Sequence, residues 1–148
     1  MLLLCSQVVL AKGGEQPNII VMLADDLGWS DVGFHGGDID TPPLDPLAAE
    51  GMELSRFYST PICSPTRAAL MTGRDPMRLG VAYGVIMPWM NNGIHPEEHF
   101  MPQSFLAAGY QTAMVGKWHL GHALQAYHPN ERGFQHFYGH LHTEVGYF

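Results

Sequence analysis

Three short polar clusters in this sequence combine residue types that can do chemistry together. Each cluster lies at the end of an expected strand or in the loop just after one. Ligands of open α/β sheets bind beyond the carboxyl ends of the strands, so the three clusters are expected to share one site. The clusters are Asp25 with Asp26, Cys63 with Arg67, and Lys117 with His119.

The adjacent carboxylates of Asp25 and Asp26 predict a site for a hard divalent cation. Neighbouring side chains in a strand point to opposite faces, so both reach one ion only where the strand has ended, and Gly28 permits such a turn. A cation relieves the repulsion between the carboxylates and uses their oxygens as ligands. From Asp25 to Glu53 the sequence has eight acids and no Lys or Arg, which favours this interpretation. A solvated turn or a helix N-cap is the alternative.

Cys63 immediately precedes Ser64 and Pro65, which are typical of the N-cap and the first position of a helix. Free backbone N–H groups and the dipole at a helix start favour an anion, and Arg67 lies one helical turn further on. These surroundings favour a nucleophilic thiolate at Cys63. The alternatives are a small buried hydrophobic residue and a disulfide with Cys5.

Lys117 and His119 alternate along an expected extended segment, so their side chains are expected on one face. There they can place a cation and a proton donor against an oxyanion. A pair of solvated residues near a strand end is the alternative.

Histidines are concentrated in the second half of the chain, where eight of the nine lie between His95 and His142. A zinc site needs convergent ligands with a recognised spacing, and His-Glu-x-x-His is absent. A separate zinc site remains open as an interpretation. So does a sugar-binding role for His140 and His142.

Short apolar runs alternate with helix patterns, which indicates an α/β domain with a mostly parallel sheet. The run at 18–24 is apolar on both faces, as in a buried strand of a parallel sheet. Residues 74–99 contain three Pro and several Gly and are expected to form an irregular loop. The other expected strands are 53–59 and 110–115, and the expected helices are 41–51, 64–73 and 102–109.

The composition fits one globular domain: the chain has 148 residues, of which 46% are hydrophobic. Its net charge of −7 argues against a nucleic-acid partner. Two cysteines exclude a disulfide framework, and no apolar run approaches the ~20 residues of a transmembrane segment. Residues 1–16 are expected to be a signal or leader segment and 17–148 the domain.

Three segments carry a specific combination of motifs. Pro61–Arg74 reads PICSPTRAALMTGR, Gly109–Gly121 reads GYQTAMVGKWHLG, and Pro17–Gly28 contains the acidic pair. Together they resemble the two signature motifs and the opening strand of formylglycine-dependent type I sulfatases of the alkaline-phosphatase-like superfamily. Thr66 stands where the family's Cys-x-Pro-Ser-Arg motif has Ser. The resemblance extends from Pro17 to the end of the sequence and implies an α/β fold, a mostly parallel sheet sandwiched by helices, incomplete in this chain.

The resemblance also implies an arylsulfatase-like sulfuric ester hydrolase whose nucleophile is a formylglycine derived from Cys63. One hydroxyl of the hydrated aldehyde would attack sulfur, and loss of a proton from the other would expel sulfate. One calcium ion would be ligated by Asp25, Asp26 and the hydrated residue 63, and would polarise the sulfate oxygens. The other implied catalytic residues, which would stabilise the ionised hydroxyl and hold the sulfate, are Arg67, Lys117 and His119.

The implied partners are a sulfated small molecule or sulfated sugar as substrate and the formylglycine-generating enzyme during maturation. The implied location is the secretory pathway, lysosomal or extracellular, or the periplasm if the source is bacterial.

The sequence departs from the family in length and in one calcium-binding pair. Family members are several times longer, and their later segment supplies an Asp-Asn pair that this sequence lacks. Calcium takes about six to eight oxygen ligands, so the isolated chain is expected to have little or no activity. Unpaired sheet edges are expected as well. The alternatives are a truncated non-catalytic sulfatase-like protein and a phosphate or phosphonate ester hydrolase of the same superfamily.

Overall fold

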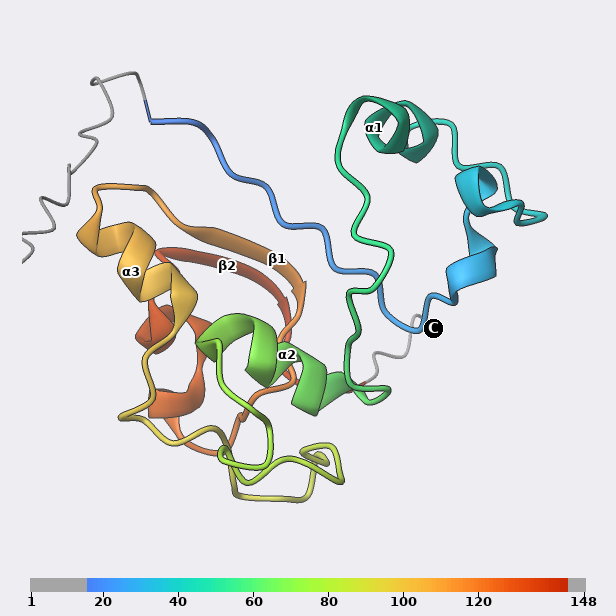
Figure 1. The fold of residues 1–148 in the computed structure, drawn as a ribbon. Helices are drawn as coiled ribbons and strands as arrows, with labels where there is room; N and C mark the ends of the chain where they lie inside the picture. The colour runs from blue at the N-terminus through green and yellow to red at the C-terminus, as the bar shows by residue number, and fades with distance from the viewer. Residues whose placement is uncertain (1–15, 144–148) are drawn as a thin grey trace, which may run out of the picture. The chain divides into compact units, whose positions relative to one another are not determined.

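The computed structural model describes residues 16–143, and the chain divides into two compact units between Gly51 and Met52 (Figure 1). The expected leader, residues 1–16, lies outside the described residues apart from Gln16. None of the helices in this part of the chain has the length and hydropathy that a membrane span requires.

The first unit begins with an extended segment, residues 16–24, which belongs to no strand of the described chain. Its apolar side chains are exposed, and Ile20 is 83% exposed. The buried strand predicted over 18–24 is therefore wrong. A strand that is apolar on both faces needs paired neighbours at its edges and helices over its faces, and residues 16–143 do not supply them to this segment.

The rest of the first unit has short helices separated by turns, and Thr41 links two of them. Its hydroxyl donates to Asp45 Oδ1 at 2.6 Å and accepts from the Gly33 N–H at 2.9 Å. The helix predicted over 41–51 is thus confirmed, with a later start. The helices of this unit are the 3-10 helices Trp29–Asp31 and Gly33–His35 and the α-helix α1, Leu44–Glu50.

Two α-helices and two strands form the framework of the second unit (Figure 1). They are α2 (Cys63–Thr72), α3 (Met101–Ala107), β1 (Ala113–Lys117) and β2 (His136–His140), with the 3-10 helices Gln125–Tyr127 and Pro129–Arg132 between the strands. The strands pair in parallel, with Ala113 opposite His136 and Lys117 opposite His140. The carboxyl ends of both strands therefore lie at one end of the sheet.

Local sequence signals predicted the helices of this unit better than its strands. Helix α2 begins at Cys63, and Gly73 ends it with a left-handed φ of 66° that favours glycine. Helix α3 confirms the helix expected at 102–109, shifted towards the amino terminus. The strand expected at 53–59 is wrong, because no described strand pairs with this segment. The strand expected at 110–115 is confirmed in type, but it begins and ends later.

The core of the second unit gathers around Trp118, which is 1% exposed. Its ring centroid lies 5.7 Å from that of Phe100 and 6.3 Å from that of Phe134, and its Nε1 donates to the Tyr127 carbonyl at 2.9 Å. The irregular loop expected over 74–99 is confirmed and contributes to this core. Burial of Trp118 fixes the chain just after β1. The other buried apolar residues of the cluster are Ala68, Met71, Val81, Ile86, Ile94 and Leu120.

The sheet of the described residues has only two strands, and part of its surface is uncovered. Val115 on β1 is 78% exposed and Tyr138 on β2 is 81% exposed. Within residues 16–143 the sheet is thus incomplete and its edges are unpaired, as the sequence predicts.

Candidate active site

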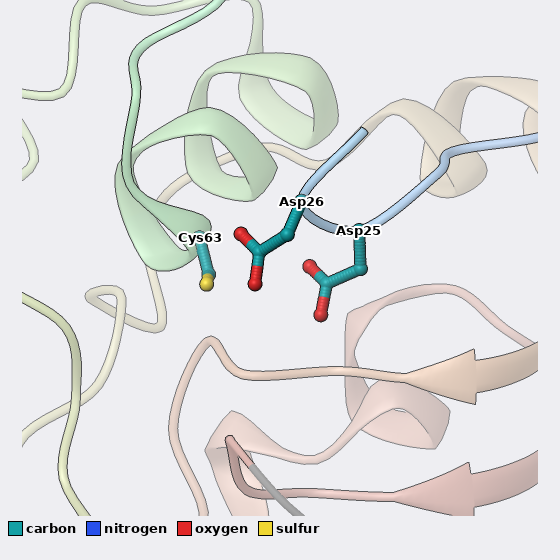
Figure 2. Close-up of side chains that lie close together, drawn as sticks. All are labelled: Asp25, Asp26 and Cys63. Atoms are coloured by element: carbon teal, nitrogen blue, oxygen red, sulfur yellow. The ribbon is translucent and has the colours of Figure 1, made fainter. Parts of the chain in front are cut away.

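Cys63 is the first residue of α2, and its thiol is free and half-buried. Figure 2 shows its side chain at the amino-terminal end of the helix. Ile62 precedes it with an extended backbone and serves as the N-cap without a side-chain hydrogen bond. The expectation that Ser64 caps the helix is wrong, because the Ser64 hydroxyl is buried and bonded elsewhere. The backbone N–H groups of the first helical turn therefore lie next to the thiol.

Arg67 lies one turn after Cys63 in α2 and is only 6% exposed. Its Nη1 donates a hydrogen bond to the backbone carbonyl of Lys117, the last residue of β1. A guanidinium keeps its charge when buried and therefore needs acceptors such as this one. The bond joins the start of α2 to the carboxyl end of β1, so two of the three polar clusters meet in the second unit.

The backbone changes direction between Lys117 and His119. Lys117 ends the strand, whereas His119 has a φ of 62°, in the left-handed region. The strict alternation expected from an extended segment is therefore not kept at His119. The Trp118 N–H donates to the His140 carbonyl at 2.9 Å, and the His119 N–H donates to the Leu141 carbonyl at 3.1 Å. These bonds fix the turn against the chain that follows β2.

His119 is 1% exposed, and its ring is held by a backbone carbonyl. The ring Nε2 lies 3.2 Å from the Ile86 oxygen. A carbonyl only accepts, so Nε2 carries a proton, and a neutral ring has its lone pair on Nδ1. The His119 carbonyl accepts from Ser64 Oγ at 2.8 Å. Sequence reasoning missed Ser64 and Ile86 as neighbours of His119, since they lie 55 and 33 residues away along the chain and no local signal links them.

Asp25 and Asp26 belong to the first unit, where they follow the extended segment (Figure 2). A carboxylate oxygen of Asp25 and one of Asp26 lie within 4.8 Å of each other. Gly28 was expected to permit a turn after the pair, but the left-handed residue is Asp26, with a φ of 56°, whereas Gly28 has a φ of −81°. Asp is one of the residues that tolerate the left-handed region. Both side chains are exposed and offer the oxygen ligands that calcium prefers.

His122 contacts a second histidine and the backbone of the 74–99 loop. The ring centroids of His122 and His142 lie 4.2 Å apart, and His122 Nε2 donates to the Pro88 carbonyl at 3.1 Å. No group of three histidines in residues 16–143 brings its nitrogens close enough to hold a metal ion. The described residues therefore give the zinc interpretation no support. A sugar-binding role for His140 and His142 stays a prediction.

Comparison with known proteins places this arrangement in one family. The family model described as Sulfatase matches residues 17–147. Arylsulfatase J of Mus musculus is 44% identical over 129 residues, covering 87% of this chain and 22% of the relative. N-acetylgalactosamine-6-sulfatase of Homo sapiens is 45% identical over 139 residues, covering 87% of this chain and 26% of the relative. The crystal structure of Ps i-CgsB, solved also in complex with k-i-k-neocarrahexaose, is 42% identical with a TM-score of 0.84, covering 90% of this chain and 30% of that one.

The chain thus spans about a quarter of the length of these curated relatives. The structural similarity confirms the predicted α/β fold, with its sheet incomplete in this chain. All three polar clusters fall inside the matched segment. Nearly the whole sequence matches one family model, and the chain therefore belongs to the sulfatase family.

Proposed function

We propose that this chain is the amino-terminal part of a sulfuric ester hydrolase, an arylsulfatase-like enzyme that cleaves a sulfate ester. The observation that carries the proposal is the hydrogen bond from Arg67 to the Lys117 carbonyl, which joins the Cys63 end of α2 to the carboxyl end of β1. Ligands of α/β sheets bind at that end of the strands. Membership of the sulfatase family supports the reaction class.

Residue 63 is the proposed nucleophile, after the formylglycine-generating enzyme has converted Cys63 to formylglycine in the unfolded chain. The hydrated aldehyde supplies two hydroxyls on one carbon, one to attack sulfur and one whose deprotonation releases sulfate. The segment Cys63–Arg67, CSPTR, retains the Cys, Pro and Arg of the motif that this enzyme modifies. At the start of α2, backbone N–H groups and the helix dipole favour negative charge on residue 63.

Arg67 stabilises the ionised form of residue 63. Its side chain is almost fully buried, so water screens its charge weakly. Arg presents several N–H donors in a planar fork, so one can anchor on the Lys117 carbonyl while others face the reacting oxygen. A lysine would supply charge at this position without that geometry.

Lys117 and His119 hold the sulfate group and the hydroxyls of residue 63. Lys117 contributes positive charge against the sulfate oxygens. The Nε2 proton of His119 is directed to the Ile86 carbonyl, so Nδ1 is the ring atom proposed to accept a hydrogen bond from a hydroxyl of residue 63. Burial of the His119 ring keeps it in one orientation.

Calcium is the proposed metal, with Asp25, Asp26 and residue 63 as ligands. The two exposed carboxylates, with oxygens within 4.8 Å of each other, fit a hard cation that binds oxygen. When bound, calcium would polarise the sulfate oxygens. Calcium takes about six to eight oxygen ligands, so the remaining ones would come from water or from residues of a longer form of the protein. The isolated chain is therefore proposed to have little or no activity.

The proposed substrate is a sulfated sugar or another small sulfate ester. Relatives named N-acetylgalactosamine-6-sulfatase and a similar structure solved with k-i-k-neocarrahexaose support a saccharide. The proposed location is the secretory pathway, lysosomal or extracellular, or a bacterial periplasm. This location agrees with where the formylglycine-generating enzyme acts.

A truncated non-catalytic sulfatase-like protein is the second candidate. Activity measurements on this chain and on any longer form distinguish it from the enzyme. A phosphate or phosphonate ester hydrolase using the same modified Cys is a further alternative, and substrate comparison separates it.

The experiment is co-expression of the chain with a formylglycine-generating enzyme, followed by mass spectrometry of the peptide that contains residue 63. We expect the mass of formylglycine in the wild type and none in Cys63→Ser, the control. Unmodified thiol alone would overturn the proposed mechanism. Turnover of matched aryl sulfate and aryl phosphate by the 148-residue chain, and by any longer form, then tests the reaction. Steady turnover by the short chain would contradict its proposed inactivity, and preference for phosphate would contradict the sulfatase reaction.

A further inference from the structure

Ser64 carries a hydroxyl that is completely buried beside the proposed nucleophile. Its Oγ donates to the His119 carbonyl at 2.8 Å and accepts from the Ile86 N–H at 3.2 Å. These bonds use its one donor and one of its two acceptor sites, and breaking either would leave a buried polar group unsatisfied. Ser64 therefore links three separate stretches of the second unit at one point.

Ile86 completes a closed set of hydrogen bonds with the same two residues. Its N–H donates to Ser64 Oγ, and its carbonyl accepts from His119 Nε2 at 3.2 Å. All three residues are at most 1% exposed. Polar groups so deeply buried hold one another rigidly, because any loss leaves an unsatisfied atom away from water.

The backbone of His119 is in a conformation that gains from such support. Its φ of 62° is left-handed, which residues with a Cβ adopt at a cost, although Asn, Asp and His adopt it more readily than others. The bond from Ser64 acts on the His119 carbonyl, next to the dihedral concerned, and the bond from Ile86 acts on the ring. Ser64 and Ile86 thus hold both the backbone and the ring of His119, in addition to the bond from its N–H to the Leu141 carbonyl.

We propose that Ser64 is a positioning residue for His119: with Ile86 it holds the left-handed turn at 119 and the Nε2-protonated form of the ring. The role of His119 in catalysis rests on the proposed function, whereas the positioning itself does not. Ser64 directly follows residue 63, so its bond to the His119 carbonyl also holds the start of α2, with the proposed nucleophile, close to His119. If the Ser64 hydroxyl had no positioning role, its removal would leave the His119 ring proton on the same nitrogen.

The test is ¹⁵N NMR of the histidine rings in the unmodified 148-residue chain, with the His119 signal identified by its loss in His119→Gln. In the wild type we expect the proton of neutral His119 on Nε2. In Ser64→Ala we expect loss of this preference, seen as a mixture of the two neutral forms. Ser64→Thr keeps the hydroxyl and is expected to restore the wild-type pattern.

Thr72→Val is the matched control, because Thr72 Oγ1 bonds only to nearby residues: it donates to the Ala68 carbonyl at 2.7 Å and accepts from the Arg74 N–H at 3.2 Å. It removes a hydroxyl from the same helix and is expected to leave the His119 ring signals unchanged. An unchanged pattern in Ser64→Ala, or a change in Thr72→Val as large as in Ser64→Ala, would overturn the proposal.

If Ser64→Ala does not fold, measurements on the wild type alone still test the proposed arrangement. A proton on Nδ1 of neutral His119, or rapid hydrogen exchange of the Ile86 amide, would refute the arrangement. Slow exchange with the proton on Nε2 supports it. None of these readouts needs formylglycine, calcium or sulfate turnover, so failure of the proposed function and failure of this inference are separate results.

Discussion

Arg67 on α2 donates a hydrogen bond from Nη1 to the backbone carbonyl of Lys117 at the end of β1. The bond connects residues 50 positions apart. It lies between the start of α2, where Cys63 is the proposed nucleophile, and the end of β1, where Lys117 is proposed to hold sulfate. It is one of the contacts that fix the position of α2 relative to β1, beside the Ser64–His119 bond and the shared core.

Arg67→Ala should therefore destabilise the chain without creating a steric clash. The substitution leaves the Lys117 carbonyl without this donor, which costs about 1–3 kcal/mol of unfolding free energy. Urea unfolding followed by circular dichroism measures the effect. Arg78→Ala, at an exposed position, should stay within about 0.5 kcal/mol of wild type. Equal losses in both variants would contradict a specific role for the Arg67 bond.

Asp25→Asn and Asp26→Asn should each weaken calcium binding by about tenfold or more, because each removes a negative charge from the proposed ligand set (~1.4 kcal/mol for a tenfold change). Isothermal titration of the chain with calcium chloride measures the dissociation constants. Asp38→Asn removes an exposed carboxylate elsewhere in the first unit and should bind calcium like wild type. If Asp38→Asn weakened binding as much, the affinity would reflect the general acidity of the segment.

Arg132 should be a major determinant of stability in the second unit. It is 2% exposed, donates to the carbonyls of Pro96, His95 and Glu98 at 2.6, 3.0 and 2.8 Å, and lies 4.1 Å from the Phe100 ring centroid. Burial lowers the pKa of Arg132, and the Glu98 carboxylate opposes that shift.

Arg132→Met keeps much of the side-chain volume but leaves three carbonyls without a donor. We expect a loss of about 3 kcal/mol or more in unfolding free energy, measured by urea denaturation. Glu98→Gln keeps the backbone carbonyl that Arg132 uses and should cost far less. A loss below 1 kcal/mol (about the value of one ordinary hydrogen bond) in Arg132→Met would show that water replaces these bonds.

Gly139→Ala should disturb the parallel pairing of β1 with β2. Gly139 lies opposite Gly116, and a Cβ at residue 139 would collide with the Gly116 carbonyl oxygen and its neighbouring backbone atoms. Backbone cannot move aside like a flexible side chain, so we expect a loss of about 1–3 kcal/mol in thermal unfolding. In Gly84→Ala the added Cβ meets no atom within 4 Å, so this control should unfold near the wild-type temperature. Wild-type stability of Gly139→Ala would indicate that the strands can separate without cost.

Helices were predictable from this sequence because their signals are local. Pro65 near the start and Gly73 at the end delimit α2, and the observed helix begins and ends one residue earlier than the expected one. The strand expected at 18–24 depended instead on partners that the sequence of one segment cannot specify. Strand β2, HFYGH at 136–140, contains Gly and His and has no continuous apolar run, so it was not predicted.

The candidate site was predictable in its residue types but not in its supports. Arg67 and Lys117 were singled out for their charge, and the structure joins them through a backbone carbonyl. Ser64 was interpreted as a cap because Ser-Pro commonly starts a helix, whereas burial turns its hydroxyl towards His119. Such a partner depends on how distant segments pack, which local patterns do not encode.

Because the chain turns in a left-handed conformation at residue 119, a substitution there alters two properties at once. Alanine deletes the imidazole and also introduces a residue that enters this conformation less readily than asparagine or glycine. Asparagine deletes the imidazole while tolerating the turn. Comparing the alanine and asparagine variants separates the conformational cost at the backbone from the loss of the imidazole. An alanine substitution alone would not distinguish these two effects.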